Sequence, residues 1–193
     1  MSAWDIILII TGILYTQLVE HSLHRYVLHS DSSKKKKKTN EKGSSWFSFH
    51  WLKHHKEARR SSMIDDAYVE VRGHALVELA LVACLMLLHV PLAMFFPSMF
   101  LGIVLGTLAY LLVHHACHTR VGWAKRHAPW HYDHHMGPDQ DSNWCVTLPL
   151  LDAFLKTRKR YAGTAREILD LQAQRRRDAK VRAKKKIKHG RSQ

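Results

Sequence analysis

The hydrophobic residues of this chain are gathered into two blocks, and the sequence between and after them is polar and densely charged. The first block covers residues 6–19 and the second covers residues 75–113. The second block contains no Lys, Arg or Asp and a single acidic residue, Glu78. It is long enough for two membrane crossings of about 20 residues each. The mean hydropathy of the whole chain, -0.26, conceals this membrane-protein pattern.

Two prolines divide the second block. Pro91 and Pro97 lie near its middle, and proline disfavours continued helix and favours a turn. We therefore predict a helical hairpin with helices over residues 75–90 and 98–113. The first block predicts an N-terminal anchor, because residues 1–5 lack the basic start of the competing interpretation, a secretory signal peptide. No strand pattern is present, so the predicted class is an all-α integral membrane protein with about three transmembrane helices.

The basic residues orient these helices. Of the 30 Lys and Arg residues, 12 lie between Arg25 and Arg72 and 18 lie between Arg120 and Arg191. Cytoplasmic flanks carry the excess of positive charge, so three crossings with the N-terminus outside place both regions on the cytoplasmic face of a multi-pass protein. The net charge of +14 is also compatible with nucleic-acid binding. Basic runs beside membrane segments attract anionic lipid, however, so we expect anionic membrane lipid and no nucleic acid as a partner.

The remaining sequence predicts one linker and one further helix. Residues 31–45 are rich in Lys, Ser and Gly without apolar periodicity, which predicts a flexible basic linker. Thr164 and Glu167 have the spacing of a capping box, which predicts a helix that begins there and becomes very basic. We divide the chain into a membrane-embedded domain over residues 1–157 and a basic C-terminal helix or tail over residues 158–193.

Ten of the 16 histidines fall into four tight groups with the spacing of metal ligands. Neutral imidazole is the commonest protein ligand for zinc, iron, copper and nickel. All four groups lie on the predicted cytoplasmic face, at or near helix ends, so we expect a helical cap there that holds the metal site. Ten candidate ligands exceed the four of a structural zinc site, and this predicts two metal ions. The groups are His24 with His29, His50 with His54 and His55, His114 with His118, and His131 with His134 and His135.

Helix geometry predicts which histidines share an ion. Residues four apart lie on one face of an α-helix, so pairs with that spacing are expected to bind one ion, and His134 widens the face of the last pair. His24 and His29 are five apart, about 140° around a straight helix, so they would serve two ions unless the helix ends between them. The pairs with the spacing of four are His50 with His54, His114 with His118, and His131 with His135.

Other polar residues could contribute to the metal site without belonging to the four histidine groups. No catalytic residue is expected beyond the metal ligands. Four carboxylates are candidate acceptors for the N–H groups of ligand histidines, with solvated charge as the equal alternative. They are Glu20, Glu57, Asp133 and Asp152. Among the histidines outside the groups, which are expected to be structural or interfacial, His115 and His127 are the alternates that a rotated helix would bring in. The others are His21, His74, His89 and His189.

These histidine groups resemble the histidine boxes of the fatty acid hydroxylase superfamily, which includes fatty acyl hydroxylases, sterol desaturases and sterol methyl oxidases. Residues 143–157 (NWCVTLPLLDAFLKT) resemble the closing segment of that family, commonly FGVTSPLWDxLFGT. The resemblance covers most of residues 20–157, so we expect residues 1–157 to be the catalytic domain. The matching boxes are EHSLHRYVLH over residues 20–29, HWLKHH over 50–55, HHACH over 114–118 and HYDHH over 131–135.

The resemblance implies a function. The ten histidines would hold two metal ions, iron by expectation with zinc as a possible occupant of the purified protein. With O2 as co-substrate, they would hydroxylate or desaturate an unactivated C–H position of a fatty acyl or sterol-like lipid. Electrons would come from an external donor, a cytochrome b5- or ferredoxin-type protein with its reductase. Three residues separate His50 from His54 where acyl hydroxylases often have two, which leaves the subfamily open.

Three other functions compete with the oxygenase. A membrane-embedded zinc-dependent hydrolase would need an open metal position and a general base such as Asp133. A non-catalytic metal-binding scaffold is disfavoured by the retention of every box histidine. A basic membrane-surface adaptor would make the histidines incidental. Intact membrane binding after mutation of the histidine groups would be consistent with this last case. Acid tests histidine ligation itself, because ligand histidines must be deprotonated to bind metal and would release it near or below about pH 6.

Overall fold

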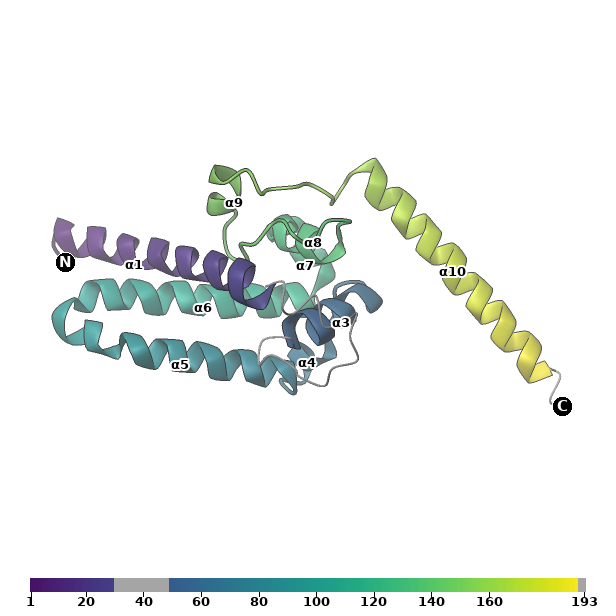
Figure 1. The fold of residues 1–193 in the computed structure, drawn as a ribbon, viewed down its shortest axis with the longest axis horizontal. Helices are drawn as coiled ribbons and strands as arrows, with labels where there is room; N and C mark the ends of the chain where they lie inside the picture. Colours follow the sequence, from purple (N-terminus) through teal and green to yellow (C-terminus); the bar gives the residue numbers. More distant parts are fainter. Residues whose placement is uncertain (30–48, 191–193) are drawn as a thin grey trace.

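Three long helices lie side by side and carry a cap of short helices at one end (Figure 1). The computed structural model describes residues 1–29 and 49–190, and the regular structure within these residues is entirely helical. Each long helix is long and apolar enough to cross a membrane, which confirms the prediction of one N-terminal helix plus a hairpin. The predicted linker over residues 31–45 lies outside the described residues. The long helices are α1 (Ala3–Ser22), α5 (His74–Phe95) and α6 (Pro97–Thr119).

The hairpin turn is shorter than the two prolines predicted. Helix α5 continues through Pro91, and α6 begins at Pro97. Pro97 occupies the first turn of its helix, where a missing N–H costs nothing. The placement of Pro91 in the turn was therefore wrong. A proline removes only its own N–H from the helix, and membrane helices tolerate this where neighbouring groups satisfy the freed carbonyl.

Glycines bring α1 and α6 into close contact. Helix α1 packs along α6 more extensively than any other two elements of the described chain pack together. A Cβ atom on Gly12 would collide with the carbonyl oxygen of Met99, and one on Gly102 would collide with that of Ile9. Small residues let backbones approach inside a membrane, where lipid tails remove the hydrophobic drive for helix association. This contact fixes how the cap ends of the two helices lie relative to one another.

The cap is assembled from short helices around a small buried core. Helix α1 passes directly into a π-helix, η1 (Leu23–Leu28), which enters the cap. The core of the cap consists of Met63, Cys117, Ala124, Ala128, Tyr132 and Tyr161. The other cap helices are η2 (His50–His54), α3 (His55–Arg60), α4 (Asp66–Val69), α7 (Val121–His127), α8 (Pro129–Met136) and α9 (Leu150–Phe154).

Two carboxylates hold the closing segment, residues 143–157, in place, Asp152 by bonds within the segment and Glu20 by bonds from α1. Asp152 accepts hydrogen bonds from the backbone N–H groups of Trp144 at 2.9 Å and Cys145 at 2.8 Å. Glu20, on α1, accepts from the backbone N–H and the hydroxyl of Thr147, at 3.2 and 2.8 Å. These bonds hold the backbone carbonyl of Trp144 beside the first histidine box.

The C-terminal helix begins where the capping box predicted. Helix α10 (Ala165–Gly190) has Thr164 before it, and the Thr164 hydroxyl accepts from the backbone N–H of Glu167 at 3.3 Å. The Glu167 carboxylate in turn binds Lys125 at 2.5 Å and the Tyr132 hydroxyl at 2.8 Å. Beyond this anchored first turn the helix projects away from the bundle (Figure 1). The division of the chain at residue 158 stays a prediction.

Candidate metal centre

All ten box histidines come together, buried, where the long helices meet the cap. Nine of them form two groups, and within each group one ring nitrogen per residue lies within 4.8 Å of all the others. The tenth, His131, lies beside the second group, with its Nε2 3.1 Å from that of His118. The first histidine group is His24, His29, His50, His55 and His134. The second histidine group is His54, His114, His118 and His135.

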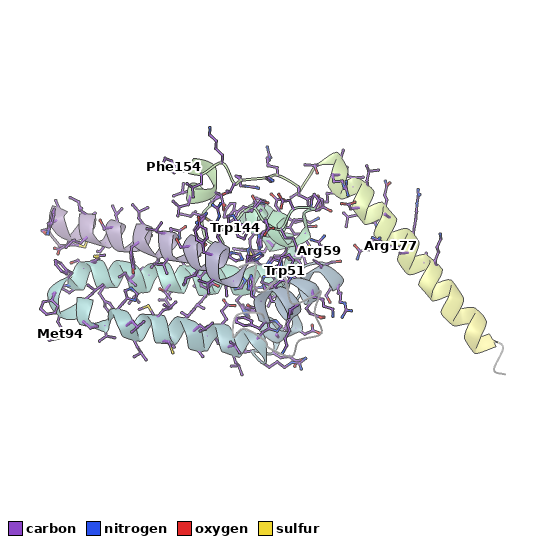
Figure 2. All side chains as sticks on the ribbon, in the orientation of Figure 1. Trp51, Arg59, Met94, Trp144, Phe154 and Arg177 are labelled. Carbon is purple, nitrogen blue, oxygen red and sulfur yellow. The ribbon has the colours of Figure 1, made fainter. Side chains whose placement is uncertain are left out.

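Two tryptophans border the first histidine group. The ring centroid of His29 lies 5.1 Å from that of Trp51 and 4.9 Å from that of Trp144. Figure 2 shows both tryptophans at the cap, with Arg59 beside them and Met94 at the opposite end of the hairpin. The histidine groups are therefore enclosed by aromatic side chains at the cap and by the long helices on the other side.

A π-helix places His24 and His29 in one group. The backbone N–H of His29 bonds to the carbonyl of His24 at 3.1 Å, across five residues rather than four. In a π-helix the residue five positions on returns to the same face, whereas in an α-helix it is rotated away. The expectation that the two histidines serve different ions, or that the helix ends between them, was therefore wrong. The helix continues between them with more residues per turn.

The second and fourth boxes each contribute to both groups. His50 pairs with His55 across a second π-helix, their Nε2 atoms 3.2 Å apart, while His54 belongs to the other group. His134 joins the first group and His135 the second. The predicted sharing of one ion by His50 and His54 is therefore corrected, as is the single face assigned to the fourth box. His114 and His118 do share a group, as predicted.

Backbone carbonyls fix the protonation of three rings. A carbonyl oxygen only accepts hydrogen bonds, so the Nδ1 atom facing it carries the proton, and a neutral ring then has a lone pair at Nε2. The structure thus aims three lone pairs into the histidine groups. The bonds run from His24 to Trp144 at 2.6 Å, from His118 to Met63 at 3.0 Å, and from His134 to Ser142 at 2.7 Å.

Those lone pairs face other ring nitrogens at distances that suit a shared cation. The Nε2 atoms of His24 and His50 are 3.0 Å apart, and those of His134 and His55 are 3.1 Å apart. Two nitrogens bound at right angles to one ion, each at about 2.1 Å, lie about 3.0 Å apart. In the second group, buried ring nitrogens of His54, His114 and His135 find no hydrogen-bond partner within the described residues. The donor set therefore fits metal ions.

Two carboxylates orient rings of the second histidine group. Asp65 accepts from Nδ1 of His54 at 2.8 Å and from Nε2 of His74 at 2.6 Å. Glu78 accepts from Nδ1 of His114 at 2.7 Å. Acceptors in this position fix the ring and strengthen its other nitrogen as a ligand. Sequence reasoning missed both roles, although Glu78 is the one acidic residue in its apolar block and that isolation was a usable signal.

The four carboxylates predicted for this role have other partners. Across residues 1–29 and 49–190, none of them accepts a hydrogen bond from a box histidine, so that prediction was wrong. Glu20 fastens the closing segment to α1, Asp152 accepts from backbone N–H groups within that segment, and Glu57 accepts only a 3.3 Å bond from a neighbouring serine hydroxyl. Asp133 pairs with Arg158 at 2.7 Å and accepts from the backbone of Ala162 at 2.6 Å. Glu20, Asp133 and Asp152 therefore position backbone rather than imidazole rings.

Burial keeps the cap histidines neutral. Loss of solvent lowers the pKa of His134 to about 4. Burial, followed by the proximity of other rings that would also be charged, lowers the pKa of five more histidines well below the usual 6.5. Neutral imidazole is the form that binds metal. The five are His50, His54, His55, His131 and His135. His115 and His127, the predicted alternates, are exposed and outside both groups.

An apolar cavity of about 470 Å³ runs between the long helices to the histidine groups. At the cap end its wall includes His24 and His50 of the first group and His114 of the second. At the opposite end the wall includes Tyr15 and His89. Tyr15 lies nine positions before His24, along α1 and the start of η1, which corresponds to about 14 Å. The cavity therefore leads from the interior of the helix bundle to both groups.

The comparison with protein families agrees with this architecture. A family model described as fatty acid hydroxylase matches residues 9–157, most of the chain and all four histidine boxes. The chain belongs to the fatty acid hydroxylase family. No curated protein and no solved structure matches it. The family, the three apolar helices and the two histidine groups together define a membrane oxidoreductase with sites able to hold metal ions.

Proposed function

We propose that the protein is a membrane-bound di-iron oxygenase that hydroxylates or desaturates an unactivated C–H position of a lipid, fatty acyl or sterol-like. The observation that carries this proposal is the meeting of the apolar cavity with both histidine groups. His24 and His50 belong to the first group and His114 to the second, and all three line the cavity wall. An alkyl chain in the cavity would present one of its carbons to both metal positions.

The ten box histidines are the proposed ligands. When bound, iron would supply the activation of O2 that an unactivated C–H bond requires. Imidazole donors suit zinc as well as iron, but zinc has no redox chemistry, and the family is one of oxidoreductases. Asp65 and Glu78 hold His54 and His114 in position and place negative charge beside an otherwise uncharged ligand set.

The protein positions the lipid and excludes water. The cavity wall between its two ends is largely aliphatic, with side chains of α1, α5 and α6 that bind an alkyl chain without offering it hydrogen bonds. The lipid would reach the histidines without leaving the bilayer, because the cavity lies between membrane-spanning helices. Apolar surroundings also limit the access of water to the reacting carbon.

The proposed reaction needs an external reductant. Hydroxylation consumes O2, two electrons and two protons, with one oxygen atom retained as C–OH and the other released as water. Desaturation consumes the same reagents and releases both oxygen atoms as water. We assign the electrons to a cytochrome b5- or ferredoxin-type carrier with its reductase. By the distribution of Lys and Arg, the cap faces the cytoplasm, and the basic helix α10 binds anionic lipid.

The hydrolase alternative is weakened by the surroundings of Asp133. This carboxylate was the candidate general base, but it is 2% exposed, paired with Arg158 and bonded to the backbone of Ala162. A base held in this way has no open side toward a water molecule at the histidine groups. The oxygenase therefore remains the function that the geometry supports best.

Metal analysis of the detergent-purified chain tests the proposal. We expect about two irons per chain, and their loss when His131, His134 and His135 are all changed to alanine. His127→Ala is the matched control, since that ring is exposed and outside both groups. One zinc per chain would favour the hydrolase or the scaffold, and no metal would refute the proposal. Mass spectrometry of lipids from cells given isotope-labelled O2 then separates hydroxylation, which labels the lipid, from desaturation, which does not.

A further inference from the structure

A hydrogen bond crosses the cavity at the end remote from the histidine groups. The Tyr15 hydroxyl on α1 lies 2.9 Å from Nε2 of His89 on α5, and the two rings meet edge to face at 5.5 Å. Helix α1 packs mainly against α6 rather than α5, so this bond spans the space between two walls of the cavity. Tyr15 and His89 are therefore both wall residues and the inner limit of the cavity.

The bonding of His89 fixes what the pair offers to a ligand. Nδ1 of His89 lies 2.7 Å from the carbonyl oxygen of Leu85, one turn earlier on the same helix. Since a carbonyl only accepts, Nδ1 carries the proton and Nε2 is the acceptor in the neutral ring. The Tyr15 hydroxyl must then donate to Nε2. The pair consists of one donor and one acceptor that face the same point.

The pair lies deep in the membrane region. His89 is eleven positions after Glu78, about 17 Å along the helix, against an apolar bilayer core of about 30 Å. Polar side chains at such depth are costly and are typical of functional positions. Three more hydroxyls line the same cavity, those of Thr16, Thr107 and Tyr110, and each already donates to a neighbouring acceptor. Polar groups are thus concentrated in a cavity whose wall is otherwise largely apolar.

We propose that Tyr15 and His89 form a binding subsite for a lipid hydroxyl. The hydroxyl, at the end of the lipid remote from the histidine groups, inserts between the two side chains, accepts from Tyr15 and donates to Nε2 of His89. The inference rests on the proposed function, because the other part of the same lipid lies at the histidine groups. It deepens that function by naming the substrate class, a lipid with a hydroxyl at its buried end.

The donor and acceptor roles predict an order of preference. A hydroxyl satisfies both members of the pair. A ketone oxygen accepts from Tyr15 but leaves Nε2 of His89 without a donor, and a buried unsatisfied acceptor is costly. A methyl end offers neither a donor nor an acceptor, so it leaves Tyr15 bonded to His89 and gains no hydrogen bond at the subsite. Lipids of equal length should therefore bind in the order hydroxyl, then ketone, then methyl.

A binding competition tests this order independently of catalysis. The full chain in detergent is incubated with a long-chain fatty acid, its ω-hydroxy derivative and the matching keto acid with its ketone next to the terminal methyl. The carboxylate keeps the other end of each probe at the aqueous side. Bound probe is measured by mass spectrometry after removal of free ligand. For each protein we take the ratio of the affinity for the hydroxy acid to the affinity for the plain acid. We expect this ratio to be about tenfold higher in the wild-type protein than in Tyr15→Phe. The comparison between the two proteins corrects for partitioning of the probes into micelles.

Matched variants locate the preference. Tyr15→Phe removes one hydroxyl from the cavity and should reduce the discrimination to about parity. Thr11→Val removes a hydroxyl from an exposed position on the same helix, where it donates to the carbonyl of Ile7, and should leave the discrimination unchanged. Equal binding of the three probes by the wild-type protein would overturn the subsite while leaving the metal and product results intact. Failure of all three to bind would overturn both the subsite and the proposed use of the cavity.

Discussion

Glu78 and His114 join two membrane helices at the edge of the second histidine group, with Oε1 of Glu78 2.7 Å from Nδ1 of His114. The carboxylate therefore faces the ring nitrogen opposite to the one available for metal. Glu78 also accepts from the Tyr110 hydroxyl at 2.8 Å. This contact makes Glu78 a positioning residue whose effect is measurable in metal affinity.

Replacing Glu78 by glutamine should weaken metal binding. The amide keeps an acceptor but loses the negative charge that strengthens His114 as a ligand, and we expect affinity to fall by about 10- to 100-fold. A chelator competition titration measures the change. Glu57→Gln is the control, since within the described chain the Glu57 carboxylate accepts a hydrogen bond only from the Ser61 hydroxyl. Equal affinities for the two variants would show that Glu78 does not tune the site.

Inserting an alanine after Tyr26 should remove metal from the first histidine group. Tyr26 is 63% exposed and lies between His24 and His29 in the π-helix. The insertion lengthens the spacing from five to six, which neither an α-helix nor a π-helix returns to the same face, so His29 turns away from its present partners. Elemental analysis should show the loss of about half the metal. Deleting Tyr26 gives a spacing of four, which an α-helix returns to the same face, and should retain the metal; loss of metal in the deletion as well would show that the spacing is not the cause.

A methyl group on Gly102 should destabilise the bundle. The added Cβ would meet the backbone of Ile9, which has no room to give way. Overpacking of this kind costs on the order of 1–3 kcal/mol. Thermal unfolding in detergent compares Gly102→Ala with Gly122→Ala, where the added atom has nothing within 4 Å. The second change should be neutral or stabilising, because alanine favours helix. Similar unfolding temperatures for the two variants would show that α1 and α6 approach one another less closely than the backbone contact at Gly102 indicates.

Acid should destabilise the metal-free protein between about pH 6.5 and pH 4. The pKa of His134 falls from 6.5 to about 4 on folding, and that of His135 falls well below 6.5, because burial penalises the charged ring. Below pH 6.5 the unfolded chain therefore binds protons that the folded chain does not, and stability falls as pH falls. Denaturant titrations across this range measure the slope, and a flat profile would contradict the burial of neutral rings.

The same shifts lower the pH at which bound metal is lost. Protons and metal compete for the ring nitrogens, so ligands with depressed pKa values keep their metal further into the acid range. Release should begin below the value near pH 6 that unperturbed histidines predict, and move toward the pKa of about 4 at His134. Metal content after dialysis at successive pH values measures the onset. Complete release already at pH 6.5 would argue against buried histidine ligands.

Sequence reasoning reached the helices more completely than the site. The apolar blocks located all three long helices, but Pro91 was wrongly placed in the turn. A proline lacks one backbone N–H whether a membrane helix ends there or continues, so the sequence alone does not distinguish the two cases. The ten histidines named from the boxes lie together in the structure, and the spacing of four paired His114 with His118 in one group. The same rule failed at His50, where a π-helix makes the spacing of five the one that brings two rings together.

The outer contacts of the histidines were the hardest to predict. Asp65 is 11 positions from His54, and Glu78 is 36 positions from His114. Nothing in the local sequence relates such pairs, because the contact exists only after separate helices have packed. The carboxylates chosen from sequence, such as Asp133, lie close to a box along the chain but turn toward Arg158 and the backbone.

The sequence by itself determined the membrane class, the three spanning helices and the ten histidines, because apolar length and residue type are local properties that a chain displays before it folds. The tertiary structure decided which histidines share a group, which carboxylates orient them, and that a cavity leads from the pair of Tyr15 and His89 to both groups. These features depend on the number of residues per helix turn and on contacts between distant segments. The packing of α1 on α6 and the bonds from Glu20 to the closing segment establish those contacts.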